Sequence, residues 1–379
     1  MFDRTITPQI ESVLWKGKII LILGPRQVGK TTLIENILTK HAAPTDVVRF
    51  HWEYHEDYDL LNSLDFGRIT TAIWDRKWIF IDEGQKIPNI GNALKILIDH
   101  YKNTHQIFVS GSSSIHLLSN TAEPLTWRKR VFTLYPLSFG EISAKYGIHE
   151  TDRKREEYLT YGSYPSVINF QNTTDKKQEL LDLTSSALYR DILEFQSIRN
   201  PQLLTRLLKI IALQIGQEVS LSALGQEVGM DSRTVERYID LLEKSFIIFR
   251  LPPYYTNKMK EITKMQKIYF YDIGIRNALL GQYTPMEDRW DTWSIWENYI
   301  ISERKRAREY AQDDSREHFW RWKNQQEIDL IEDTGGKLSA IEIKIKEQKS
   351  KIPSEFASIY GDIPFREINR VNYPSFLIP

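Results

Sequence analysis

A short glycine-containing stretch near the N-terminus is the feature that most limits which fold this chain can adopt. Residues 24–31 read GPRQVGKT and fit the pattern G-x-x-x-x-G-K-[ST]. The apolar segment 18–23 before them predicts a strand, and residues 31–40 after them have helical spacing. A loop in this position can aim main-chain N–H groups and the positive end of a helix at an anion. The stretch therefore predicts a phosphate site; the alternative is a glycine-containing turn without a ligand.

The residues of this loop have distinct predicted roles. We expect Lys30 to reach the β- and γ-phosphates of a nucleotide, and the Thr31 hydroxyl to ligate Mg²⁺. The expected ligands of the site are therefore ATP and Mg²⁺. The residues predicted to bind them are Gly24, Pro25, Arg26, Gln27, Val28, Gly29, Lys30, Thr31 and Thr32.

An acid pair follows a second apolar strand, because residues 78–83 read WIFIDE. Ligands of open α/β sheets bind beyond the carboxyl ends of the strands, and these acids would lie there. We expect Asp82 to hold Mg²⁺, directly or through water, and Glu83 to polarise the attacking water.

Further polar residues are candidates for the same site. Ser110 ends a third apolar strand, where it would contact the γ-phosphate or the water, or else cap a turn. Arg128 and Arg130 could stabilise transition-state charge, in cis or from a neighbouring subunit of a homo-oligomer, or could form surface ion pairs. The predicted catalytic residues are Lys30, Glu83, Ser110 and Arg130.

Composition limits the partners and the compartment. The 379 residues include 50 Lys and Arg and 50 Asp and Glu, so a nucleic-acid partner would need local basic patches. The absence of cysteine excludes disulfides and thiolate metal sites. No apolar run near the N-terminus approaches the about 20 residues that span a bilayer. We expect a cytoplasmic protein without membrane contact.

The order of predicted elements divides the chain into three parts. Apolar strands that alternate with helices predict a parallel sheet covered on both faces in the first part. The pattern changes around residues 146–165, where a charge run, a glycine and a proline occur. We place the domains at 1–160, 161–285 and 286–379.

The middle part predicts a winged helix-turn-helix. Residues 219–231 suggest a short helix and a turn, Ser232 would cap a second helix, and two strands follow. In a DNA-binding version, Arg233 and Arg237 would enter the major groove. The lysines expected to touch phosphates from the wing are Lys258, Lys260, Lys264 and Lys267. The alternative is a protein-docking or purely structural unit.

The last part contains a predicted hairpin with charged residues on one face. Its strands, 327–331 and 341–345, flank Gly335-Gly336. Period-2 alternation puts Glu342 and Lys344 on one face, with Asp329 opposite them. Such a set can hold a divalent cation and activate a water, and Glu297 could add a third carboxylate. The alternative is an ordinary solvent-facing hairpin.

These segments together resemble a family of prokaryotic AAA-type ATPases that join a P-loop domain to a C-terminal domain of unknown function. The resemblance covers nearly the whole chain. Its segments include GPRQVGKTTLI at 24–34, IFIDEGQKIPN at 79–89, LYPLSFGEI at 134–142, YFYDIGIRNALLG at 269–281 and FWRWKNQQEIDLI at 319–331. This sequence departs from the family pattern at Lys129-Arg130, where the family has Gly-Arg.

The resemblance implies a fold class and a second site. The fold class is α/β, a P-loop NTPase (AAA-type) parallel sheet followed by a winged helix and an α+β domain similar to restriction endonucleases. The (D/E)-x-K core of such folds would make Asp329 and Glu342 metal ligands, with Glu297 accessory to them. Lys344 would position water.

We expect a Mg-dependent ATPase whose nucleotide state controls a DNA-binding, nuclease-like C-terminal half. The whole protein would then be an ATP-dependent DNA-processing enzyme. The alternative is a nucleotide-switched regulator that binds DNA or protein and has an inactive nuclease fold. A third hypothesis is an ATPase that acts on proteins.

Overall fold

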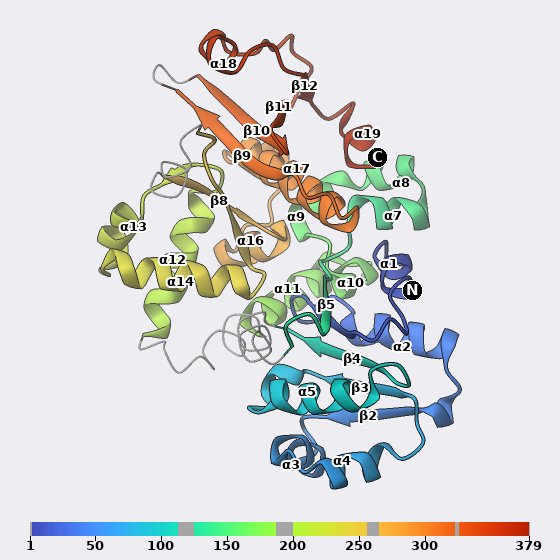
Figure 1. Ribbon diagram of the computed structural model, residues 1–379. Coiled ribbons are helices and arrows are strands. Elements are labelled where there is room, and N and C mark those ends of the chain that lie inside the picture. The colour runs from blue at the N-terminus through green and yellow to red at the C-terminus, as the bar shows by residue number, and fades with distance from the viewer. Residues whose placement is uncertain (1, 113–124, 187–199, 256–264, 323–325, 379) are drawn as a thin grey trace. The chain divides into compact units, whose positions relative to one another are not determined.

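The structure is a computed structural model that describes residues 2–112, 125–186, 200–255, 265–322 and 326–378 (Figure 1). The chain forms two compact units. The first contains residues 3–136 and 244–246, and the second contains residues 137–243 and 247–379.

The first unit is built on one parallel sheet. Its strands run in the order β2-β3-β4-β1-β5, and every neighbouring pair is parallel. All residues of β1 are buried, as expected for a strand covered on both faces. The elements are α1 Thr7–Glu11, β1 Ile19–Leu23, α2 Lys30–His41, β2 Val47–His51, α3 His55–Ser63, α4 Phe66–Ile73, β3 Trp78–Asp82, α5 Ile90–Tyr101, β4 Gln106–Gly111 and β5 Lys129–Thr133.

The sheet order brings the ends of three strands together. β4 lies between β1 and β3, and all three run in the same direction. Their carboxyl ends therefore meet at one edge of the sheet, which is where α/β proteins bind their ligands.

The last strand of this sheet, β5, ends at Thr133, and helix α7 (Phe139–Tyr146) begins six residues later. A capping box starts this helix. The Ser138 hydroxyl accepts the N–H of Glu141 at 3.2 Å, and the Glu141 carboxylate accepts the N–H of Ser138 at 2.9 Å.

The second unit begins with helices. They are α7 Phe139–Tyr146, α8 Ile148–Arg153, α9 Arg155–Tyr161, α10 Pro165–Asn169 and α11 Thr173–Ser186. The boundary between the compact units falls at 136–137, because α9 packs on α16 (Ile273–Leu280) and α7 contacts α19 (Tyr373–Leu377). The three predicted domains, with bounds near 160 and 285, stay a prediction.

A helix-turn-helix follows within the second unit. Its elements are α12 Pro201–Leu213, β6 Glu218–Val219, α13 Leu221–Val228, α14 Ser232–Lys244, β7 Ile248–Leu251 and β8 Gln266–Phe270. The strands form an antiparallel sheet in the order β6-β8-β7. The cap of α14 differs from the prediction, because the Asp231 carboxylate rather than Ser232 accepts the Thr234 N–H, at 3.0 Å.

The C-terminal strands form a four-stranded sheet in the order β12-β11-β10-β9. The elements of this part are η4 Met286–Asp288, α17 Thr292–Tyr310, β9 Arg316–Arg321, β10 Glu327–Thr334, β11 Lys337–Ile343, α18 Ser354–Tyr360 and β12 Phe365–Ile368. The predicted hairpin is present, since β10 and β11 pair antiparallel around Gly335 and Gly336, whose φ angles are 60° and 93°.

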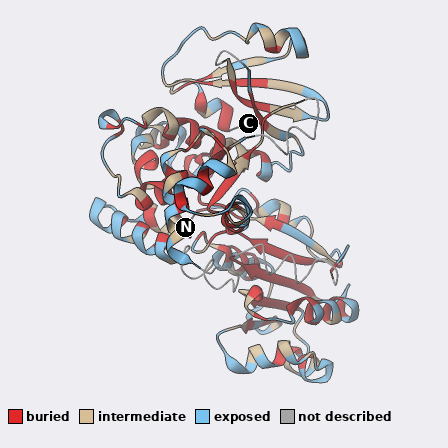
Figure 2. Cartoon of the chain, turned by 90° about the vertical axis from the view of Figure 1, so that its left-hand side faces the viewer, coloured by how far each residue is buried: buried red, intermediate tan, exposed pale blue. Residues whose placement is uncertain are grey.

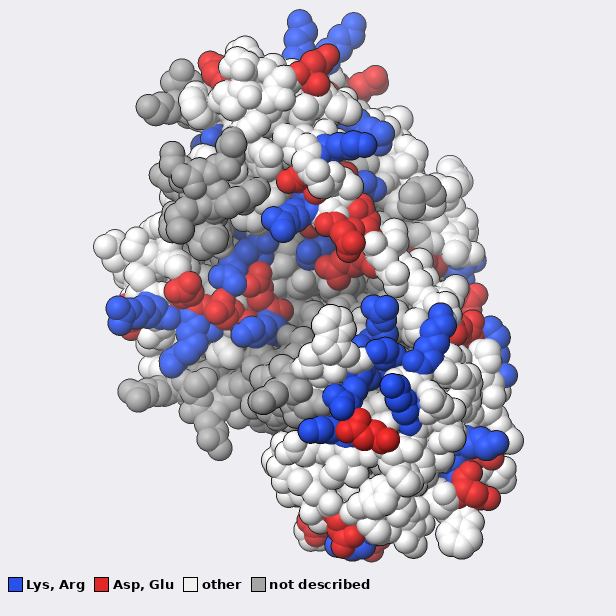
Figure 3. Space-filling model, viewed as in Figure 1, with Lys and Arg blue, Asp and Glu red and all other residues white. Residues whose placement is uncertain are grey.

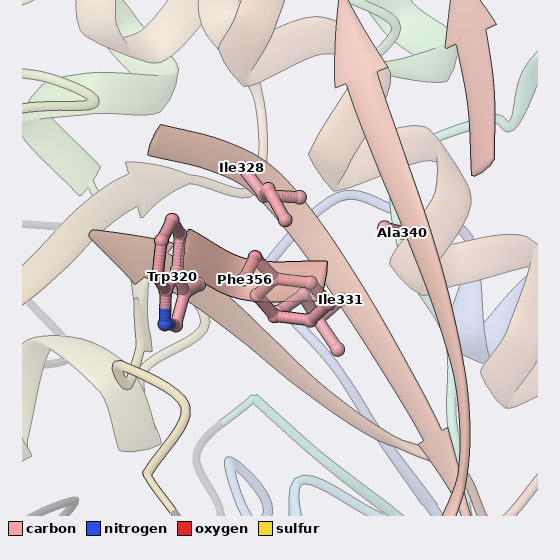
Figure 4. Close-up of a cluster of buried hydrophobic side chains, with 5 residues drawn as sticks. All are labelled: Trp320, Ile328, Ile331, Ala340 and Phe356. Carbon is pink, nitrogen blue, oxygen red and sulfur yellow. The ribbon is translucent and has the colours of Figure 1, made fainter. Parts of the chain in front are cut away.

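The core of this part lies between the sheet and α18. Figure 4 shows Trp320 of β9, two isoleucines of β10 and Ala340 of β11 gathered around Phe356 of α18. Figure 2 colours the chain by burial: the strands are mostly buried, and many helices are exposed along one side. Within the described ranges, no helix is both long and apolar enough to cross a bilayer.

Candidate functional site

The predicted phosphate loop lies where β1 ends and α2 begins. Gly29 has a φ of 95° and precedes the first residue of α2. Gly24 has a φ of 148°, and a Cβ placed on it would stand 2.0 Å from the carbonyl oxygen of Leu134. Only glycine therefore fits at position 24, and the loop can follow the backbone of the segment after β5.

The loop brings Lys30 and Thr31 to the acids after β3. The Lys30 ammonium is buried, donates to the carbonyls of Gly24 and Pro25 at 3.0 and 2.9 Å, and lies 4.0 Å from Glu83 Oε1. The Thr31 hydroxyl donates to Asp82 Oδ1 at 3.2 Å. A hydroxyl and a carboxylate that converge in this way are the hard oxygen donors that Mg²⁺ prefers, so these residues fit the ion.

Ser110 connects the two acids. Its buried hydroxyl donates to the Asp82 carboxylate and accepts the Glu83 N–H at 2.9 Å. The serine at the end of β4 therefore lies in the site and positions both acids. Its predicted contact with the γ-phosphate or the water stays a prediction.

Two residues that the sequence did not single out orient Glu83. The Gln85 amide donates to the Glu83 carboxylate and, at 3.0 Å, to the Ser112 hydroxyl. Glu83 itself has a φ of 49°, an uncommon conformation for a side-chain-bearing residue. Burial pushes the pKa of Glu83 upward, but the Lys30 ammonium and the hydrogen bonds from Gln85 and Ser112 bring that pKa below its ordinary value.

Arg4 also supports the loop and was missed. Its guanidinium donates to the carbonyl of Val28 at 2.7 Å and to the carbonyl of Tyr135 at 2.6 Å. It therefore joins the phosphate loop to the segment after β5. A lone arginine ahead of the first helix gives no periodic or motif signal, so sequence reasoning had no means of finding it.

The predicted arginines lie away from this group. Arg130 is exposed on β5 in register with Ile20, and Arg128 forms an ion pair with Asp99 at 2.7 Å. β5 runs parallel to β1, so Arg130 lies well before the carboxyl edge that carries the loop. The structure does not bring Arg130 to Lys30 and Glu83, and a role from a neighbouring subunit stays a prediction.

The C-terminal charged residues line a pocket of about 950 Å³ in the second unit. Ile343 N–H donates to Asp329 Oδ2 at 2.7 Å, and the Lys344 ammonium lies 2.6 Å from Glu342 Oε1. The predicted proximity of these side chains is therefore present in the hairpin. Burial, then the nearby Glu297 and Glu342 carboxylates, raise the pKa of Asp329 well above its usual range.

Lys267 is buried, which differs from the expectation that it lies on the surface of the wing. Its side chain is 3% exposed and its ammonium donates to Glu297 Oε1 at 3.0 Å and contacts Glu327. Lys267 shares one face of β8 with the buried Tyr269, so its side chain lies inside the unit. Across the described part of the chain, no group of three or more His, Cys, Asp or Glu side chains is arranged to hold a metal ion. The role of Glu297, Asp329 and Glu342 as metal ligands stays a prediction.

The predicted DNA-reading residues lie on α14. Arg233 and Arg237 are exposed there. Lys258, Lys260 and Lys264 lie outside the described residues. On the described part of the face in Figure 3, basic side chains are interspersed with acidic ones, in keeping with the balanced overall charge.

Three family models match consecutive parts of the chain. An AAA domain matches residues 16–143, a domain of unknown function (DUF8612) matches 152–285, and another (DUF4143) matches 294–374. The first match covers the parallel sheet and the phosphate loop. The N-terminal part is therefore an AAA-type P-loop domain, a nucleotide-binding class.

Relatives extend over most of the chain. Uncharacterized proteins of Mycobacterium tuberculosis and Mycobacterium bovis are each 25% identical over 348 residues, which is 90% of this chain and 73% of theirs. An uncharacterized protein of Methanocaldococcus jannaschii is 27% identical over 324 residues, covering 80% of this chain and 70% of its own.

Solved structures give weaker likenesses. A DNA replication initiation factor is 13% identical, covers 63% of this chain and 86% of its own, and has a TM-score of 0.25. Cdc6p from Pyrobaculum aerophilum is 11% identical, covers 73% and 91%, and has a TM-score of 0.31. Scores this low carry no argument, so the class of the N-terminal domain rests on the AAA match and on the loop geometry.

Proposed function

We propose that the protein binds ATP with Mg²⁺ at its P-loop and hydrolyses it. The observation that carries the proposal is the meeting of Lys30, Thr31 and Ser110 with the acid pair 82–83 at one edge of the parallel sheet. These are the residue types that hold phosphates, a hard cation and a water in phosphoryl transfer.

Each residue has a defined task in binding. Lys30 exchanges its bonds to the loop carbonyls for phosphate oxygens, and the N–H groups at the start of α2 face the same anion. Thr31 and Asp82 would hold Mg²⁺, which when bound neutralises charge on the phosphate oxygens. Arg4 keeps the loop in shape from behind, through the Val28 carbonyl.

Glu83 acts as the base of the reaction. Its lowered pKa keeps the carboxylate ionised at neutral pH, so it can accept a proton from water as that water attacks the γ-phosphorus. The bond between the γ-phosphorus and the bridging oxygen breaks, and ADP and phosphate leave. Gln85 and Ser110 hold the Glu83 side chain and main chain in place for this step.

The test is ATP turnover together with binding calorimetry in Mg²⁺. We expect Glu83→Gln to bind ATP like the parent and to lose turnover by about 100-fold or more, the range of a general base. Lys30→Ala should lose binding. Glu35→Gln is the matched control, because Glu35 of α2 forms an ion pair with Arg49 of β2 and is not among the residues that meet at the site. Full turnover in Glu83→Gln would contradict the proposed base.

We further propose that the nucleotide state controls what the second unit binds, with DNA as the candidate partner. Two observations favour binding over cleavage. Lys267 pairs with Glu297 of the predicted nuclease site and with the neighbouring Glu327, and α14 presents Arg233 and Arg237 outward. A winged helix of this element order can place such a helix in the major groove.

DNA affinity measured without nucleotide, with ATP and with ADP tests this second proposal. We expect the three affinities to differ. We also expect Arg233→Ala and Arg237→Ala each to lower the salt dependence of binding by about one counterion, whereas Arg206→Ala on α12 should not. Equal affinity in all nucleotide states would refute the control by nucleotide. DNA nicking in Mg²⁺ that is lost in Asp329→Ala or Lys344→Ala would instead support the DNA-processing hypothesis.

A further inference from the structure

The carboxylates of the C-terminal pocket already have a buried cation among them. The Lys267 ammonium donates to Glu297 Oε1 at 3.0 Å and contacts the Glu327 carboxylate. Both Lys267 and Glu297 are almost fully buried, with side chains 3% and 4% exposed. A buried ammonium needs such partners, because an unpaired charge there would be strongly disfavoured.

Glu297 is also engaged on its other sides. The Tyr269 hydroxyl donates to the same Oε1 at 2.6 Å. The main chain at Gly216 closes a further side, since a Cβ placed there would stand 3.1 Å from Glu297 Oε2. A divalent ion at Glu297 would therefore have to displace two donors from one oxygen.

Lys267 and Tyr269 come from one face of β8, whereas the carboxylates come from other elements. Glu297 lies on α17, Glu327 and Asp329 lie on β10, and Glu342 lies on β11. The helix-turn-helix sheet therefore supplies the cation, and the C-terminal sheet and α17 supply the anions. The Lys267 charge also acts on Asp329, where it opposes the effect of burial on the pKa of that carboxyl.

We infer that the Lys267 ammonium takes the place of a divalent cation in this pocket, as an internal counter-ion for Glu297 and Glu327. Glu297 of the predicted nuclease site thus belongs to an ion-pair network that joins β8 to α17 and β10. The wild-type protein accordingly has no divalent-metal site here, and removal of the Lys267 charge creates one. This inference concerns the second unit and does not depend on the ATPase proposal.

The test is titration of the full chain, free of nucleotide, with Mn²⁺ by calorimetry and electron paramagnetic resonance. We expect wild type and Lys267→Arg to show no saturable Mn²⁺ site that depends on Asp329. Lys267→Met should gain one saturable Mn²⁺ site, with an affinity about tenfold or more above the upper limit that the wild-type titration sets. Adding Asp329→Asn should abolish that site.

The matched control is Lys344→Met, which removes another lysine from the same pocket and should create no site. Asp82→Asn identifies any Mn²⁺ held near the P-loop. Wild-type binding of Mn²⁺ that Asp329→Asn removes would overturn the inference, as would a folded Lys267→Met that gains no site. If Lys267→Met unfolds, recovery of cooperative unfolding in Mn²⁺ supports the inference, and failure to recover while Lys267→Arg stays folded refutes it.

Discussion

A single amide side chain holds the carboxylate that we assign as the base. Gln85 donates to Glu83 from two residues further along the chain, and Ser112 receives the second bond of the same amide nitrogen. The Lys30 ammonium is the strongest influence that lowers the pKa of Glu83, and the Gln85 bond adds to it. Both favour the ionised form that accepts a proton.

We therefore predict that the acid limb of the pH profile for ATP turnover lies below the ordinary titration range of a glutamate, because the lowered pKa keeps Glu83 ionised. Gln85→Leu removes a bond to the ionised form, so the pKa of Glu83 rises and the acid limb moves toward neutral pH. Turnover measured from about pH 4 to 8 checks this. Gln178→Leu on α11 should leave the profile unchanged, and an unshifted limb in Gln85→Leu would count against the role of Gln85.

Lys267 has a second measurable consequence, on stability. Removing one partner of a buried ion pair leaves the other charge unpaired, so Lys267→Met should lower the free energy of unfolding by about 3–5 kcal/mol in metal-free buffer. Lys267→Arg keeps the charge and should lower it less. Urea unfolding measures both, and a loss below about 1 kcal/mol, the value of an exposed pair, would contradict the buried pair.

At the scale of elements, the phosphate loop and the segment after β5 form one piece. Gly24 packs against the Leu134 carbonyl, and the Leu134 N–H donates to the Leu23 carbonyl at 2.7 Å. Arg4 ties the same segment to Val28. The shape of the loop is therefore fixed by its neighbours as well as by its own glycines.

Gly24→Ala tests how much the close packing of Gly24 against the Leu134 carbonyl contributes to ATP binding. A methyl group 2.0 Å from the Leu134 oxygen forces the backbone to move, and a positive φ disfavours alanine. We expect ATP affinity to fall by about tenfold or more, because the main-chain N–H groups of the loop no longer point at the phosphates. Gly67→Ala on α4, with no atom closer than 3.5 Å to its Cβ and no positive φ, is the control. Unchanged affinity in Gly24→Ala would show that the loop tolerates the shift.

At the scale of the whole molecule, the chain has two compact units, and the P-loop lies in the first. ATP stabilises the unit that binds it by mass action, by about 2.7 kcal/mol at a hundred times its Kd. We expect scanning calorimetry to resolve two transitions, with MgATP raising that of the first unit more. A shift of the second transition measures the coupling between units. Equal shifts of both, or none of the first, would contradict this prediction.

The site that the sequence predicted best is built from local motifs. Residues 24–31 and the acid pair 82–83 stand at the ends of apolar strands, and parallel strands carry such ends to one edge. Ser110 followed from the same rule. The hairpin was also local, because Gly335 and Gly336 mark its turn.

The residues that sequence reasoning missed or misplaced depend on tertiary packing. Arg4 meets Val28 and Tyr135 only in the folded unit. Lys267 was grouped with the wing lysines by its charge, and alternation gave no contrary signal, because Ile268 and Phe270 on the opposite face of β8 are apolar as well. Charge alone does not reveal burial, because a paired lysine can lie inside.

Arg4 makes the shape of the phosphate loop depend on a residue that lies outside every motif of the sequence. A fused tag that pulls on the first residues, or a proteolytic nick just after them, would detach the guanidinium from the Val28 and Tyr135 carbonyls. The glycines and the lysine of the loop would all remain, yet the loop would lose the two hydrogen bonds that fix its curvature.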